Sequence, residues 1–152
     1  MRKRGIILYL SCLCGFLVVS SVCAQEEDPA ASFRKLRAGL ARSRVPAEDI
    51  RSNSAALRSM LARGANRDDL VTAVVQLYRK GIFGGAMNTS INYMDELIAA
   101  GVPSGESAGV VLQGIDRGMA QGFKCGDQAL MNEVRRAVRE KEQSLDKSKN
   151  SE

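Results

Sequence analysis

The sequence contains no histidine and no tryptophan, and most of its cysteines lie near the N-terminus. Without histidine the chain cannot build the Ser-His or Cys-His pairs that activate many enzyme nucleophiles, and it has no imidazole ligand for a metal ion. Only Cys125 lies after residue 24, so the rest of the chain cannot hold an internal disulfide. We therefore predict no metal site, no cofactor, and a fold held together by its hydrophobic core.

Recognisable catalytic motifs are absent as well. The sequence has neither a GxxxxGK[ST] phosphate loop nor an EF-hand calcium loop. Its neighbouring acidic residues, such as Asp68 and Asp69, mostly lie where a helix would begin, and helix capping and the helix dipole explain acids at such positions. We therefore predict a protein that is not an enzyme and has no catalytic residues. The alternative is a small hydrolase that uses two carboxylates across a cleft.

The first 24 residues have the composition of a secretory signal peptide. The basic segment MRKR is followed by an uncharged apolar run and by the small-residue boundary VCA. We predict cleavage between Ala24 and Gln25, and export to the periplasm or the cell exterior. Two alternatives would keep the protein at the membrane, namely an uncleaved signal anchor or a lipid on Cys23.

The net charge changes when the signal peptide is removed. The full chain has 22 lysines and arginines against 17 acids, and a sequence pI of about 9.2. Loss of Arg2, Lys3 and Arg4 takes 22 bases to 19, against the same 17 acids. So small an excess is not the concentrated basic stripe that nucleic-acid binding requires, and no nucleic-acid partner is expected.

Helical periodicity dominates the rest of the chain. Between residues 32 and 145 apolar residues recur every three or four positions, in segments separated by glycine or proline turns. We predict one all-α domain over residues 32–145, a compact bundle of five to six short helices, with one continuous helix from residue 46 to about residue 63. A polar lead-in (25–31) precedes this domain, and a charged, disordered tail (146–152) follows it.

An internal repeat relates two segments of the predicted domain. Residues 57–82 align without a gap on residues 94–119, and the identical positions include Gly64 with Gly101 and Gly81 with Gly118. Each segment has the pattern helix, glycine turn, helix, at a period close to that of helical-hairpin repeats. The sequence therefore predicts a duplicated helix-turn-helix (αα-hairpin) unit of about 37 residues.

Glycine is frequent in the helix predicted before residue 122. Projection as a helix places glycines on both flanks of its apolar face. Interior glycine costs about 1 kcal/mol relative to alanine, so we expect close approach of neighbouring helices to offset that cost. The predicted helix-packing glycines are Gly105, Gly109, Gly114, Gly118 and Gly122. A separate group, Gly81, Gly84 and Gly85, is the candidate hinge.

The position of Cys125 allows two interpretations. It follows Lys124 at a predicted helix boundary. A lone cysteine in an exported protein indicates a free thiol or an intermolecular disulfide, and a nearby lysine would make the thiol more reactive. The alternative is a small buried residue in a turn, since free cysteine is among the most buried residue types.

Together these features predict a class of function. We expect an exported, non-catalytic helical binding or structural module of the cell envelope, because arrays of helical hairpins bury one face and present the other to partners. The expected partner is another protein or a second copy of the chain. The membrane is a partner only if the N-terminus acts as an anchor, and no motif specifies a small-molecule ligand.

Overall fold

The computed structural model describes residues 28–149, and every regular element in that range is an α-helix. The helices are α1 (Pro29–Arg42), α2 (Ala47–Ser52), α3 (Ser54–Ala62), α4 (Arg67–Arg79), α5 (Gly84–Ala99), α6 (Ser104–Ala120) and α7 (Gln128–Lys149). The all-α prediction is confirmed, although seven helices replace the expected five to six. The predicted signal peptide, Cys23 and the bond between Ala24 and Gln25 lie outside the described residues. Within residues 28–149, no helix combines the length and the apolar character that a membrane span requires.

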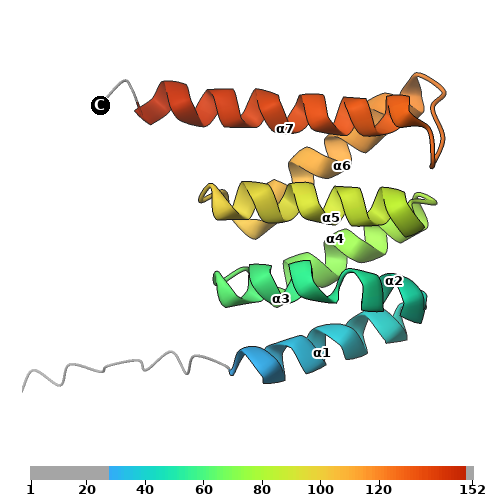
Figure 1. Cartoon of the computed structure of the whole chain (residues 1–152), viewed down its shortest axis with the longest axis vertical. Coiled ribbons are helices and arrows are strands. Elements are labelled where there is room, and N and C mark those ends of the chain that lie inside the picture. Colours follow the sequence, from blue (N-terminus) through green and yellow to red (C-terminus); the bar gives the residue numbers. More distant parts are fainter. Residues whose placement is uncertain (1–27, 150–152) are drawn as a thin grey trace, which may run out of the picture.

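The helices form two layers, and the chain passes from one to the other in turn (Figure 1). Helices α1, α4 and α6 follow one another in one layer, and α2–α3, α5 and α7 follow one another in the second. The stack therefore consists of three antiparallel hairpins, which are α1 with α2–α3, α4 with α5, and α6 with α7. The first and the last hairpin each keep one face without a neighbouring helix from the described chain.

The hydrophobic core lies between the two layers. Its largest fully buried side chains are Leu36, Leu40, Leu57, Met60, Leu70, Leu77, Ile82, Met87, Ile91, Met94, Leu97 and Ile115. Burying one such side chain contributes roughly 1.5–3 kcal/mol. Because the cysteine of the described chain, Cys125, is free, this burial and not a disulfide holds the hairpins together.

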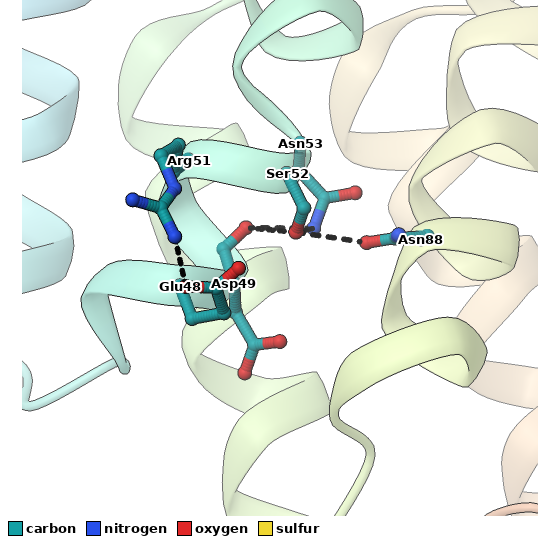
Figure 2. A network of polar contacts seen from close by, with 6 residues as sticks. All are labelled: Glu48, Asp49, Arg51, Ser52, Asn53 and Asn88. Atoms are coloured by element: carbon teal, nitrogen blue, oxygen red, sulfur yellow. Dashed lines mark hydrogen bonds and ion pairs between the residues drawn. The ribbon is translucent and has the colours of Figure 1, made fainter.

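The helix expected over residues 46–63 is divided in two at Asn53. The Asn53 side-chain nitrogen donates to the Asp49 carbonyl oxygen at 2.8 Å. Side chains that bond to carbonyls of the preceding turn compete with the helical backbone, which accounts for the break and for the additional helix. Figure 2 shows that the neighbouring Ser52 hydroxyl reaches across to Asn88 on α5, to which it donates at 3.3 Å.

The helical region extends further at both ends than the sequence indicates. Helix α1 begins at Pro29, before the expected start at residue 32, because the Asp28 carboxylate caps it by accepting a backbone N–H of the first turn at 3.1 Å. Helix α7 continues to Lys149, past the expected end at Leu145, which still packs against the core. Most of the predicted disordered tail is therefore helical, and residues 150–152 lie outside the described range.

Five of the helices end in the same kind of turn. Helices α1, α3, α4, α5 and α6 are each followed by a residue with left-handed backbone, which is a glycine in every case except Arg44. The next residue donates its N–H to a carbonyl of the last helical turn, as Ile82 does to Leu77 and Val102 does to Leu97, both at 3.0 Å. These are Schellman turns, in which glycine avoids the steric cost of left-handed backbone and an apolar side chain returns to the core.

The internal repeat matches the structure at one turn and departs from it at the next. Gly64 and Gly101, which the repeat aligns, both have left-handed backbones, with φ of 83° and 92°. Gly81 has this conformation after α4, but its aligned partner Gly118 lies inside α6, and the left-handed residue there is Gly122. Helix α6 has 17 residues and α4 has 13, so one additional helical turn shifts the register. The ungapped duplication is therefore not confirmed as a complete unit.

Candidate functional site

Two of the predicted packing glycines lie where α6 meets α7. A Cβ added at Gly114 would lie 2.6 Å from the Val134 Cα, and one added at Gly118 would lie 2.5 Å from the Leu130 Cδ1. Both separations are shorter than real Cβ contacts. At Gly114 the neighbouring atom belongs to the α7 backbone, so glycine permits this approach, whereas at Gly118 it is the end of a flexible side chain. Helices α6 and α7 also share the most extensive contact in the described chain.

The other three glycines of this set have different surroundings. Gly109 is exposed, and nothing lies within 4 Å of an added Cβ. Gly122 follows α6 with φ of 90°, in a Schellman turn. Gly105 approaches α4 only through the Asp69 side chain, whose Oδ2 would lie 3.3 Å from an added Cβ. The close backbone approach expected on both flanks of α6 is therefore found only on the flank that faces α7.

The candidate hinge around Gly81, Gly84 and Gly85 is held in place by packing on one side and by a hydrogen bond on the other. Ile82 is fully buried, and the Gly84 N–H donates to the Asp49 Oδ1 at 3.0 Å. Between these two anchors the Phe83 side chain is 56% exposed. Movement at this turn stays a prediction.

Cys125 lies beside the same turn. Its thiol is half-buried and free, and Sγ lies 3.8 Å from the Phe83 carbonyl oxygen. With Gly84 and Met131 it lines a shallow groove of about 550 Å³. The thiol is therefore neither fully buried nor cross-linked within the described chain.

We expect the Cys125 thiol to react with iodoacetamide several times more slowly in the folded protein than in denaturant, because it is partly covered and hydrogen-bonded. Alkylation is followed by intact mass, and Ala99→Cys in a Cys125→Ser background supplies an exposed reference thiol. Equal rates in the folded and denatured protein would contradict this placement. A doubled mass that collapses on reduction would show that Cys125 links two chains.

Members of the paired acids form hydrogen bonds and ion pairs within the fold. The Asp69 Oδ2 accepts from the Ser104 hydroxyl at 2.7 Å, and Asp95 forms an ion pair with Arg63. Across the described range, no cluster of three or more His, Cys, Asp or Glu side chains could hold a metal ion.

Several basic side chains of α7 have nearby partners. Arg136 forms an ion pair with Glu133 on the same helix, and Lys141 pairs with Glu106 of α6 at 2.7 Å. The Arg135 Nε donates to the Tyr93 hydroxyl at 2.8 Å. The contacts of Lys141 and Arg135 join α7 to α6 and α5, so these basic side chains have partners within the fold.

The first hairpin differs in charge from the rest of the stack. Residues 28–63, which form α1 to α3, carry eight lysines and arginines against three acids, a formal charge of +5. Residues 64–149 carry eleven of each sign. The positive charge of the described chain is therefore concentrated in its first hairpin.

An open groove lies along this hairpin, between α1 and α2–α3. It encloses about 680 Å³, and we call it the arginine groove. Its lining residues are Phe33, Arg34, Arg37, Ala38, Ala41, Ala47, Glu48, Ile50, Arg51, Ser54 and Arg58. In α1 these residues form the flank opposite Gly39, which faces Val71 of α4, so the groove opens away from the rest of the stack.

The arginines of the groove differ in their contacts. Arg51 forms an ion pair with Glu48 on α2, on the side of that helix away from Asn88 (Figure 2). The Arg58 guanidinium lies over the ring of the buried Phe33, 4.4 Å from its centroid. A guanidinium stacked on a ring keeps its N–H edge available to a carboxylate or phosphate.

Two further arginines, Arg34 and Arg37, are exposed on the α1 wall, and neither forms an ion pair with any residue in the range 28–149. Sequence reasoning missed this site, although the excess of bases over residues 28–63 was a readable signal.

No protein-family model, no curated protein and no solved structure matches the chain.

Proposed function

We propose that the protein is an exported, non-catalytic binding module of the cell envelope, and that the arginine groove is its binding surface. The observation that carries the proposal is an open groove lined by four arginines and one acid, in the hairpin that holds the excess positive charge of the described chain. Arginine binds carboxylates and phosphates through two parallel hydrogen bonds, which suits it to anionic partners. The small side chains of Ala38, Ala41 and Ala47 would let such a partner approach both walls.

Export is inferred from the composition of the first 24 residues. The repeated hairpin is inferred from the left-handed turns that the aligned segments share at Gly64 and Gly101. We infer that the helical hairpin is a repeated unit of about 37 residues, with one turn inserted in α6. Stacked hairpins of this type bind partners through surfaces that several helices share. The arginine groove, which has one wall on α1 and the other on α2–α3, is a surface of this kind.

Site-directed photo-crosslinking tests the binding surface. We expect p-benzoylphenylalanine at Ala41, inside the groove, to form a discrete adduct in the native envelope. The same residue at Ala120, which is exposed at the end of α6, is the matched control and should form none. The absence of an adduct from Ala41, or equal adducts from both positions, would contradict the proposal.

Intact mass of the purified protein tests export in the same preparation. A mass that begins at Gln25 is the expected result. Added lipid on Cys23 or an intact N-terminus would instead indicate a membrane-anchored protein, and the groove would then face a partner near the bilayer.

A further inference from the structure

We propose that the arginine groove receives an acidic amphipathic helix of a partner protein. This inference rests on the proposed function and specifies the chemistry of the partner. Each groove wall carries guanidinium groups, with Arg34 and Arg37 on α1 and Arg58 on α3. The only acid in the lining is Glu48, which already pairs with Arg51.

The fold itself indicates that the occupant is a helix. In the last hairpin, both helices, α6 and α7, pack against α5 of the preceding hairpin. The arginine groove is the equivalent position on the first hairpin, and no helix of the described chain precedes it (Figure 1). A helix that lies between two others is also a common mode of peptide recognition.

The floor of the groove favours a helix with a narrow apolar stripe. The lining includes Ala38 and Ala41 on α1 and Ala47 on α2, and these small side chains permit close packing of an incoming helix. Acidic side chains on both edges of the stripe would then reach the arginines of the two walls. Charge complementarity of this kind sets the specificity and orientation of binding.

Other occupants fit these observations less well. With cleavage after Ala24, only residues 25–27 precede the described chain, which is less than one helical turn. A second copy offers no acidic excess, because residues 64–149 carry equal numbers of bases and acids. A bilayer is flat, so it would contact the rims of the groove and leave its floor open.

Binding of defined probes tests the inference on the protein purified from its native envelope. The probes are a labelled helical peptide of 14 residues, the length of α1, with a leucine stripe flanked by glutamates, a counterpart with lysine in place of glutamate, and phosphatidylglycerol vesicles. We expect the glutamate peptide to bind and the lysine peptide not to bind. Arg34→Glu with Arg37→Glu should weaken the glutamate peptide about tenfold or more, because each exposed arginine–carboxylate pair contributes a few-fold to affinity.

The matched control is Arg79→Glu with Arg139→Glu, which changes the net charge equally at exposed positions outside the groove. It should change affinity by less than about twofold. Arg34→Gln with Arg37→Gln should give an intermediate loss, and far-UV circular dichroism verifies that all variants fold. Equal weakening by both reversals, or binding of vesicles but not of the glutamate peptide, would overturn the inference. If the glutamate peptide does not bind but p-benzoylphenylalanine at Ala41 still forms a discrete adduct, the groove is a binding surface and its partner is not an acidic helix.

Discussion

Replacing Gly114 by alanine is expected to lower the free energy of unfolding by about 2 kcal/mol, although alanine is the better helix former. The added Cβ would lie 2.6 Å from the Val134 Cα and 3.1 Å from the Glu133 carbonyl oxygen. Both atoms belong to the backbone of α7, so no rotamer change can relieve the contact and α7 itself must move. Overpacking costs roughly 3 kcal/mol at the upper end of its range, and the helix propensity of alanine returns about 1 kcal/mol.

Urea unfolding followed by circular dichroism measures this change, with Gly109→Ala as the matched control in the same helix. Nothing lies within 4 Å of a Cβ at Gly109, so that variant should gain roughly 0.5–1 kcal/mol. The free energy of unfolding of Gly118→Ala should fall between those of the other two variants, because the atom nearest to the added Cβ is the Leu130 Cδ1, at the end of a flexible side chain. Equal stability of the Gly114 and Gly109 variants would show that α7 does not pack on α6 at this position.

The contrast between Gly109 and Gly114 marks the limit of what the sequence predicts. Both lie inside α6, on opposite flanks of its apolar face, and projection alone gives them the same role. Their surroundings differ because α7 covers only one flank of α6, and this depends on how the last hairpin closes. Features fixed by local backbone geometry are easier to predict. Asn66, a residue type common at N-caps, precedes Asp68 and Asp69 in the sequence, and its side chain accepts from the N–H groups of both at the start of α4.

The division of α2 from α3 shows a second limit. Apolar periodicity continues through this segment, and the sequence therefore predicts one helix. The break depends on which hydrogen bond the Asn53 side chain makes, and in the structure it bonds to the Asp49 carbonyl oxygen. Asn53 is buried, so this choice is made by packing in the assembled stack and not by helix propensity.

The arginine groove was partly visible in the sequence. The charge of residues 28–63 can be counted directly, and Arg34 and Arg37 lie on one side of a helix. Their approach to Arg58 requires the hairpin between α1 and α3, which periodicity does not place. The high overall pI does not reveal that the positive charge is concentrated in residues 28–63, because part of that pI comes from the basic residues of the predicted signal peptide.

Replacing Asp49 by alanine is expected to lower the free energy of unfolding by about 1.5–2 kcal/mol. Asp49 on α2 is a buried residue, 7% exposed, and its Oδ1 accepts the Gly84 N–H at 3.0 Å. Helix α5 receives no side-chain cap from its own N-cap residue, Phe83, so Asp49 supplies the cap from the preceding hairpin. Asp49 lies in the first turn of α2, where acids commonly serve their own helix, whereas its carboxylate joins two hairpins.

Glu48→Ala is the matched control, because Glu48 is the exposed neighbour of Asp49 and its ion pair with Arg51 should contribute less than about 1 kcal/mol. Asp49→Asn keeps an acceptor oxygen and should lose only the interaction of the negative charge with the helix dipole, about 0.3–1 kcal/mol. Hydrogen exchange at the Gly84 amide should accelerate in the alanine variant. Equal stability of the Asp49 and Glu48 variants would show that α5 needs no cap from α2.

A related contact occurs in the other layer of the stack, where the Asp69 Oδ2 of α4 accepts from the Ser104 side-chain hydroxyl at the start of α6, and not from a backbone N–H. Both contacts join residues 35 apart in sequence, and each links the first turn of one helix to the start of the next helix in its layer. Because the two sites share no partner, the losses from Asp49→Ala and Asp69→Ala should add in the double variant. A loss larger than this sum would mean that the two layers open together, since removing one contact would then weaken the other.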